Sequence, residues 1–542
     1  MLTKFWHRYG TDVVWLSALL LCGLKFTHHL PQIIDYPISD EGAYLQDGLD
    51  IPLKGVKPVY WGSLYNIWYY IGSLLIPDKI MLYYAHLRLL TIGIPFLLYI
   101  LLRIIGISPA VSFTSAFLYL LSFGNLYIFH KGNHTALFLM LVVLVCGYRL
   151  HHKIHFWLLA AMAILMSAFI RPELFMAFWL AISVYVFLIL KSNLIKIKKL
   201  IIVITILLST FYLSRLMFAH QNRSFYTFQS NFPVNWVKWT NSNLDPDQNN
   251  SLLFKQAFGN ATTIGQAFES NPSLFFKNIL WNIRGMGENY IKLGLTHFNI
   301  LLPATRRSFT FIEGMIFTLI LLVLTWKAHR KNKDLVLKIK ENARWFLFSC
   351  FLGVPCLITN MLFYPRYNYI MLPVFLTFLL FPILFFKNPE KTLSYSKMIG
   401  IILLLFALTP SPTLGNNWYF APVERNNNFD KTPVKNCVEA INALPLKYSV
   451  VSFIAEKATF QYTSKLINGV SIFHDGISVE EFIRANKIEL VVVSNLLLTN
   501  NMVNEIVGFP SFIAHPEAYS FKQLPIRNTT TYLLVSQSAL NN

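Results

Sequence analysis

The chain has 542 residues, of which 13% are charged and 55% hydrophobic, and its mean hydropathy is +0.48. A soluble protein usually carries about 25% charged residues, so this composition excludes an ordinary soluble globular protein and indicates that lipid is the main solvent. Basic residues outnumber acidic ones, 46 to 26. The excess does not indicate a nucleic-acid partner, because many of these bases lie in short connections between apolar runs, as is typical of cytoplasmic loops.

The apolar runs are each about 20 residues long, which is enough to cross the hydrocarbon core of a bilayer. We expect a mainly α-helical, polytopic membrane protein with about eleven transmembrane helices. The runs lie near residues 12–30, 81–105, 107–129, 135–150, 155–170, 174–190, 199–218, 309–326, 345–364, 369–386 and 398–413. The first run lacks a small-residue cleavage site, so we interpret it as a retained helix and not as a signal peptide.

Lysine and arginine in the connections predict the orientation of these helices, because basic residues near helix ends are retained in the cytoplasm. With the N-terminus in the cytoplasm, every cytoplasmic connection contains at least one basic residue. We therefore expect a membrane domain over 1–415, with outer loops at 31–80 and 219–308, and an extracytoplasmic domain over 416–542. The predicted location is a bacterial inner membrane. Two large loops and a domain on the same side of the membrane are unusual for transporters, which bind their substrates at the midplane.

The tail has the pattern of a small α/β domain. The runs at 447–455, 488–494 and 530–536 are rich in β-branched and apolar residues and predict buried strands. Between the first two, Ser478 and Glu481 have the spacing of a capping box at the start of a helix over 478–487. The tail has no glycine-rich nucleotide loop, so we expect it to support the membrane domain or to recognise an acceptor.

Asp40 and Glu41 form an acidic pair in the sequence SDEGAYL, directly after the first apolar run. Two adjacent carboxylates beside a membrane are costly unless a cation shares their site. One alternative is that an acid or Ser39 caps a short helix over 41–50. Because capping needs a single acid, the pair also indicates a catalytic or ligand-binding role.

The next segment, 59–76, predicts an amphipathic helix that lies flat in the membrane interface. Its apolar and polar residues recur at steps of three and four on opposite faces. The apolar face contains Trp61, Leu64, Trp68, Ile71 and Leu75, and the polar face contains Ser63, Asn66, Tyr70 and Ser73. We expect this helix to anchor the loop and also to form a wall of a groove for a lipid carrier.

Arg171 and Glu173 flank Pro172 where two apolar runs meet on the predicted outer side. Proline interrupts the helix there, which allows both charged side chains to face one opening. An arginine at this depth either extends to the lipid headgroups or pairs with an anion. The sequence leaves both possibilities open.

A second outer turn has the sequence Tyr364-Pro-Arg366-Tyr367-Asn-Tyr. The planar guanidinium of arginine suits phosphate oxygens, and tyrosine hydroxyls add neutral donors to the same group. We therefore predict a phosphate-binding role for Arg366 with Tyr364 and Tyr367, the alternative again being an arginine that extends to the headgroups.

Together these segments resemble the GT-C superfamily of polyprenyl-phosphate-sugar-dependent glycosyltransferases. The similarity is to the protein O-mannosyltransferase and lipid A aminoarabinose transferase branch. It rests on the order and common side of SDEGAYL at 39–45, the aromatic stretch at 59–76, RPE at 171–173, PRYNYIMLP at 365–373 and the domain after the last helix.

The resemblance implies transfer of a sugar, with inversion, from a polyprenyl-phosphate carrier to a lipid, glycan or protein acceptor on the non-cytoplasmic face. Asp40 would be the general base and Glu41 would assist it, while Arg366, Tyr367 and Arg171 would hold the carrier phosphate. These groups would have to converge in one cavity that opens at the outer leaflet. The expected partners are this donor, membrane lipids and the acceptor, with no nucleic acid.

No cofactor is assigned, although aminoarabinose transferases can bind a divalent metal. The spacing of His130 and His134 would allow the two imidazoles to share a metal, and a polar helix connection explains them equally well. Two other functions stay open. One is a transporter or flippase of lipid-linked saccharides, and the other is a ligase or polymerase of envelope polysaccharide.

Overall fold

The structure of the protein is a computed structural model, and the side chains discussed below belong to the residues that it describes. These are residues 2–28, 30–33, 41–56, 62–126, 132–148, 153–191, 197–217, 223–244, 246, 249–295, 339–385, 395–409, 433–445, 450–454, 463, 467–470, 477–498, 506–526 and 529–541.

The chain divides into two compact units. The first comprises Met1–Phe26, Val56–Tyr65 and Leu87–Pro410, and the second comprises Thr27–Gly55, Asn66–His86 and Ser411–Asn542. The second unit thus contains the tail together with much of the first outer loop. The domain boundary expected near residue 416 separates the tail in sequence, whereas the loop joins it in space.

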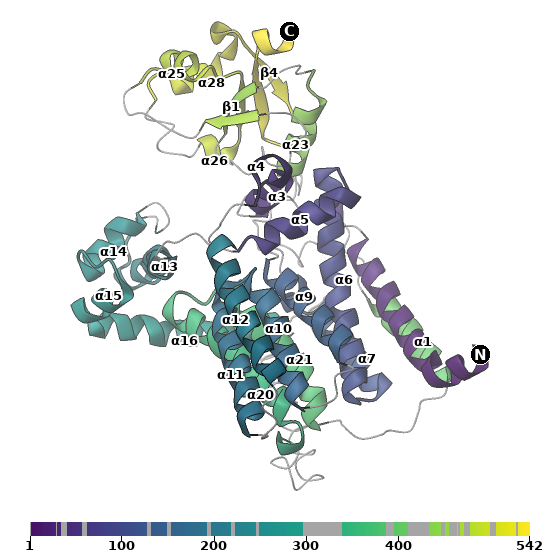
Figure 1. The fold of residues 1–542 in the computed structure, drawn as a ribbon. Helices are drawn as coiled ribbons and strands as arrows, with labels where there is room; N and C mark the ends of the chain where they lie inside the picture. Colours follow the sequence, from purple (N-terminus) through teal and green to yellow (C-terminus); the bar gives the residue numbers. More distant parts are fainter. Residues whose placement is uncertain are drawn as a thin grey trace. The chain divides into compact units, whose positions relative to one another are not determined.

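The first unit is a helical bundle (Figure 1). Among the described residues, four helical stretches are long and apolar enough to cross a membrane: Gly10–Thr27 of α1 (Leu2–Thr27), α6 (Lys79–Ile105), Pro172–Lys191 formed by η1 (Pro172–Leu174) and α11 (Phe175–Lys191), and α20 (Ala343–Leu362). Shorter apolar helices lie in α7 (Pro109–Leu121), α9 (Gly132–Gly147), α10 (Lys153–Ala168), α12 (Ile197–Met217), α21 (Tyr367–Phe385) and α22 (Tyr395–Leu408).

Every predicted apolar run coincides with one of these helices, except 309–326, which lies outside the described residues. The mainly helical fold is thereby confirmed, and by length and composition four of its helical stretches could cross a membrane. The number of spanning helices stays a prediction.

Small residues let the helices in the centre of the bundle approach one another. Ala160, Ala161 and Ala163 of α10 are fully buried, and α10 packs against both α9 and α11. The hydroxyl of Ser167 on α10 donates to the carbonyl of Ala136 on α9 at 2.7 Å. Small side chains and interhelical hydrogen bonds of this kind stabilise helix packing in a bilayer, where no hydrophobic effect drives helices together.

Polar contacts show which helix ends lie on the same side of the bundle. Lys25, in the last turn of α1, donates to the carbonyls of Phe406 at 2.6 Å and Ala407 at 3.3 Å, near the end of α22. Arg103, near the end of α6, donates to Asp12 of α1 at 2.6 Å. Helices α1 and α22 therefore run in the same direction and α6 runs in the opposite one, as the predicted alternation requires.

The second outer loop folds into a helical lobe of the first unit (Figure 1). It consists of α13 (Arg223–Thr240), α14 (Asn250–Phe258), α15 (Ile264–Ser270) and α16 (Pro272–Leu295). Phe228, Phe232, Phe254 and Phe258 form its aromatic core, with Leu362 and Phe363 at the end of α20 packed against it. A short helix, α8 (Phe123–Leu126), contacts both α16 and α21.

The tail contains a five-stranded sheet in the order β2-β1-β3-β5-β4. Strands β2 (Ile467–Val470), β1 (Val450–Ile454) and β3 (Leu490–Val493) are parallel, while β5 (Tyr532–Ser536) and β4 (Phe521–Pro525) are antiparallel to their neighbours. Helices accompany the strands: α23 (Pro433–Ala443), α25 (Val479–Asn486), α26 (Asn495–Leu498), α28 (Phe509–Ala514), η3 (Pro516–Tyr519) and α29 (Gln537–Asn541). The predicted small α/β domain is thus present.

Both faces of this sheet are covered. Along β3, Val491 and Val493 belong to a core cluster with α25 and α28, whereas Leu490 and Val492 belong to a second cluster with α23. The alternation follows from the period of two of a strand. At the start of α25, the hydroxyl of Ser478 accepts a hydrogen bond from the backbone of Glu481 at 3.2 Å, which confirms the predicted cap.

The first outer loop forms four helices: α2 (Leu30–Ile33), α3 (Glu41–Leu49), α4 (Ile51–Lys54) and α5 (Leu64–Leu75). Helix α3 confirms the predicted helix over 41–50. Within the second unit, Lys435 of the tail donates to the carbonyl of Pro31 at 2.8 Å, and Lys79 donates to that of Thr463 at 3.1 Å. The loop and the tail therefore lie on the same side of any membrane that the helices cross.

Candidate functional site

Arg171 and Glu173 lie where α10 gives way to η1. The backbone N–H of Arg171 donates to Ser167 at 2.8 Å, and Pro172 begins the single turn of η1, where a missing N–H costs little. Arg171 Nε donates to Glu173 Oε1 at 2.7 Å, and the two side chains are only 13% and 18% exposed. This arrangement supports the paired alternative for Arg171, with an anion that the protein itself supplies.

The same arginine joins two motifs that lie far apart in the sequence. Its guanidinium carbon lies 5.0 Å from the ring centroid of Tyr369, in the first turn of α21. A cation over an aromatic face is attracted by the ring quadrupole. The RPE segment and the PRYNY segment therefore meet at one end of the bundle, as the common cavity requires.

Arg366 lies in the turn between α20 and α21, and its charged side chain is on the protein surface. Its backbone N–H donates to the carbonyl of Tyr364 at 2.8 Å, while its side chain is exposed. Within the described part of the chain, its guanidinium has no hydrogen-bond or ion-pair partner. A nearby second cation, Lys238 of α13, donates to the hydroxyl of Tyr364 at 3.3 Å. Tyr367 is half-buried and, like Tyr290 of α16, packs against the cluster of Leu293, Ile370 and Val374.

Helix α16 fixes the backbone of this turn. Asn289 donates to the carbonyl of Pro365 at 2.5 Å, and Asn282 donates to that of Met361 at 3.0 Å. A Cβ on Gly285 would lie 2.9 Å from Pro365 Cγ, so the close approach requires glycine. The turn that presents Arg366 is thus held by a rigid element.

These supporting residues belong to none of the motifs predicted from the sequence. Asn278, Asn282 and Asn289 are spaced by four and seven residues, which places polar side chains on one face of a helix. That periodicity was the available signal. Lys238 gave no comparable signal, because nothing local distinguishes it from other loop lysines.

Asp40 lies outside the described residues, whereas Glu41 begins α3 and is fully buried. Its carboxylate accepts a hydrogen bond from the hydroxyl of Tyr69 on α5. The Tyr69 ring lies 4.9 Å from that of His86, whose Nδ1 accepts a hydrogen bond from Trp68 Nε1 at 2.8 Å. Glu41 of the acidic pair and the aromatic segment thus meet within the second unit.

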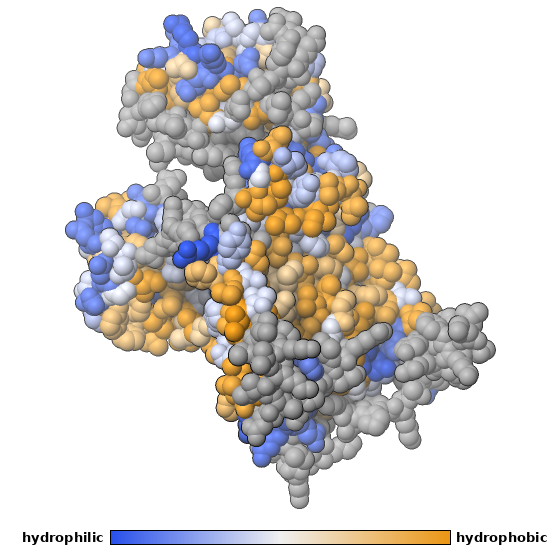
Figure 2. Space-filling view, viewed as in Figure 1, coloured by the Kyte–Doolittle hydropathy of each residue, from blue (hydrophilic) through white to orange (hydrophobic). Residues whose placement is uncertain are grey.

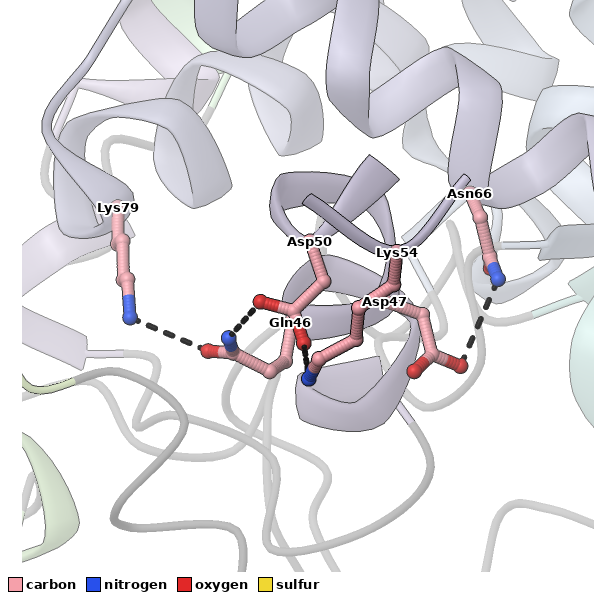
Figure 3. Close-up of polar contacts among 6 residues, drawn as sticks. All are labelled: Gln46, Asp47, Asp50, Lys54, Asn66 and Lys79. Atoms are coloured by element: carbon pink, nitrogen blue, oxygen red, sulfur yellow. Dashed lines mark hydrogen bonds and ion pairs between the residues drawn. The ribbon is translucent and has the colours of Figure 1, made fainter. Parts of the chain in front are cut away.

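A polar network adjoins this cluster on α3, α4 and the start of α6 (Figure 3). Lys79 donates to Gln46 at 3.2 Å, and Gln46 donates to Asp50 at 2.8 Å. Asp50 also binds Lys54, and this hydrogen bond, together with the charge of Asp50, raises the pKa of Lys54. Each acid of the network has a cationic or amide partner. We therefore interpret the network as structural, because its hydrogen bonds join the helices of this loop.

Helix α5 is buried on its polar face. Ser63, before its first turn, and Asn66 are buried, whereas Ile71 and Leu75 are 53% and 81% exposed. Trp61 lies outside the described residues. Apolar side chains that point outwards are what the predicted interfacial helix requires.

The described residues contain no group of three or more histidine, cysteine, aspartate or glutamate side chains that could hold a metal. His134 is buried, and its Nε2 lies 2.9 Å from the carbonyl of Gly124, which gives this imidazole a structural hydrogen bond. His130 lies outside the described residues.

Comparison with models of known protein families gives no match, and no curated protein matches the chain. The contacts and exposure of the site residues are therefore the basis for a function. Arg171, Glu173, Tyr364, Arg366 and Tyr367 belong to the first unit and Glu41 to the second. Their convergence in one cavity stays a prediction.

Proposed function

We propose that the protein is an integral membrane glycosyltransferase of GT-C type that takes its sugar from a polyprenyl-phosphate carrier. The acceptor is a lipid, a glycan or a protein on the non-cytoplasmic face of a bacterial inner membrane. The observation that carries the proposal is the exposed guanidinium of Arg366, in a turn that α16 holds rigidly. With Lys238 and the hydroxyl of Tyr364 nearby, this turn offers the donors that a phosphate monoanion or diester requires.

The reaction is a single displacement. Asp40 accepts the proton of the acceptor hydroxyl, and the acceptor oxygen attacks the anomeric carbon from the face opposite to the carrier. The bond between that carbon and the phosphate oxygen breaks, and its electron pair leaves with the polyprenyl phosphate. Arg366 and Lys238 stabilise the charge that develops on the leaving group, where prearranged donors have their largest effect.

Glu41 and Arg171 have supporting roles in this proposal. Glu41 is buried and bonded to Tyr69, so it positions the loop that carries Asp40 and does not itself meet the acceptor. Arg171 is paired with Glu173 and packed on Tyr369, so it positions the first turn of α21 beside Arg366.

The surroundings of the loop fit a lipid-linked donor. The exposed apolar face of α5 gives a polyprenyl chain a hydrophobic surface at the interface. The tail lies on the same side as the first outer loop, where it is available for the acceptor.

The test is a transfer assay with purified protein and radiolabelled polyprenyl-phosphate sugars. Arg366→Gln is expected to lower the rate about 100-fold, the usual effect of removing one charge-stabilising donor, while Arg366→Lys retains part of it. Asp40→Asn should abolish transfer in a protein that still folds. Arg484→Gln, at an exposed position of α25, is the matched control. Unchanged transfer in Arg366→Gln would refute the phosphate site.

The same assay distinguishes a glycosyltransferase from the two alternatives, a flippase and a ligase or polymerase. A flippase of lipid-linked saccharides would move the donor across a vesicle membrane without forming a product, and Asp40→Asn would leave that movement unchanged. A ligase or polymerase would release products heavier by a whole oligosaccharide and not by one sugar.

A further inference from the structure

Helix α16 exposes large apolar side chains although part of the face that it buries is polar. Its buried face contains Phe275 and also Asn278 and Asn282, which both accept hydrogen bonds from Asn235 at 2.8 Å. Its exposed face contains Phe276 and Leu280, which are 54% and 67% exposed. A surface helix in water buries its apolar residues and exposes its polar ones. The exposed face of α16 departs from this pattern.

Cationic and aromatic side chains edge this apolar face. Trp281 is 40% exposed, and the guanidinium of Arg284 lies 5.8 Å from its ring. Lys277 lies 4.7 Å from the ring of Trp239 on α13. Tryptophan, lysine and arginine beside apolar residues are typical of helices in the headgroup layer, where the ring spans the boundary and the cation contacts lipid phosphate.

The shape of the face agrees with a lipid partner. A shallow, open hollow of about 420 Å³ lies on the surface of α16, lined by Ser273, Phe276, Lys277, Leu280, Trp281 and Arg284. Figure 2 shows hydrophobic surface over the lower part of the lobe formed by α13–α16. In Figure 1, α16 runs across the direction of α11 and α12, as a helix in the membrane plane does beside helices that cross it.

We propose that α16 lies in the headgroup layer of a leaflet that contains anionic phospholipids. Phe276 and Leu280 insert among the acyl chains, and Lys277 and Arg284 contact the lipid phosphates. Glu288 takes part of the charge of Arg284, to which it lies 3.3 Å away, so Lys277 is the stronger contact. The membrane thereby holds the helix that positions the Arg366 turn.

Spin labels on the full-length protein in nanodiscs test the depth of the helix. Leu280→Cys is made on a background with Cys146→Ser, because Cys146 is the exposed cysteine among the described residues. We expect the label at 280 to collide more often with oxygen than with a water-soluble nickel complex. Leu404→Cys on α22, 58% exposed in an apolar helix, is the lipid control, and Glu480→Cys of the tail is the water control.

A label at 280 that behaves like the one at 480 would overturn the proposal. A label that is immobilised and reached by neither reagent would overturn it too, because a protein surface would then cover the face.

The anionic component is tested with Lys277→Gln and Arg284→Gln. In nanodiscs of phosphatidylcholine and phosphatidylglycerol, native mass spectrometry measures which lipid the protein retains. We expect the preference for phosphatidylglycerol to fall about fivefold in Lys277→Gln and by less in Arg284→Gln. An unchanged preference would refute the phosphate contacts, while Lys340→Gln, exposed at the other end of the bundle, should leave it unchanged.

Discussion

Charged side chains within the apolar part of the protein are paired with partners that the protein supplies. Arg171 is paired with Glu173, and Arg103 with Asp12. Removing one partner of a largely buried pair leaves an uncompensated charge, which costs more free energy than removing both. Arg366 is the contrasting case, because it is exposed and has no such partner among the described residues.

Arg171→Met is accordingly expected to destabilise the protein by about 2–4 kcal/mol, since Glu173 loses its partner. The double variant Arg171→Met with Glu173→Gln should recover at least half of this loss. The midpoint of thermal unfolding in detergent, followed by circular dichroism, measures both. A double variant less stable than the single one would contradict the pairing.

The buried carboxylate of Glu41 gives a second prediction at this scale. Glu41→Ala leaves the hydroxyl of Tyr69 without this acceptor and should cost about 1–3 kcal/mol. Glu41→Gln keeps an oxygen acceptor and should cost less. Adding Tyr69→Phe to Glu41→Ala should cause little further loss, because the two changes remove one hydrogen bond. Thermal unfolding is again the measurement, with Glu439→Ala, exposed on α23, as the control.

At the scale of elements, close approach of helices decides how the outer loop is built. Gly48 of α3 lies against α5, where an added Cβ would be 2.6 Å from the carbonyl oxygen of Asn66 and 2.8 Å from Tyr69 Cβ. Neither neighbour is the flexible end of a side chain. The contact between α3 and α5, and hence the bond between Glu41 and Tyr69, depends on this glycine.

Gly48→Ala should therefore destabilise the protein by about 1–3 kcal/mol through overpacking. It should also lower transfer activity, because it displaces the loop that carries Asp40. Gly287→Ala on α16 is the matched control, since nothing lies within 4 Å of its added Cβ. There alanine should be neutral or stabilise the helix by up to about 1 kcal/mol. Equal losses in both variants would show that the close approach is unimportant.

At the scale of the whole molecule, we expect the parts of the chain outside the helices to lie on defined sides of the membrane. The hydrogen bonds from Lys435 and Lys79 place the first outer loop and the tail on one side. The basic connection before α20 is predicted on the other side, because positive residues resist translocation. The shared side of the loop and the tail follows from contacts, whereas the side of the basic connection follows from its charge.

Labelling of intact cells tests both statements together. Cysteines placed at the exposed positions Lys54 and Glu480 should react with a membrane-impermeant thiol reagent from outside, after its passage through the outer envelope. A cysteine at Lys340 should react only after the membrane is permeabilised. Reaction of the cysteine at 340 in intact cells would contradict the predicted orientation. Reaction at only one of positions 54 and 480 would contradict the contacts between loop and tail.

The sequence by itself determined many elements of this protein, although not β2, β4 or the helices α13–α16. Apolar length predicted the helices of the bundle, β-branched runs predicted β1, β3 and β5, and the spacing of Ser478 and Glu481 predicted the start of α25. Each depends on residues that are neighbours in the chain, because helix and strand periods and caps are local properties.

Only the tertiary structure decided which side chains meet. Glu41 pairs with Tyr69, Arg171 stacks on Tyr369, and Lys238 reaches Tyr364, 126 residues further along the chain. The packing of whole helices brings these groups together, and no short sequence pattern specifies it. For the same reason the apolar side chains that α16 exposes can be recognised only once its buried and exposed faces are known.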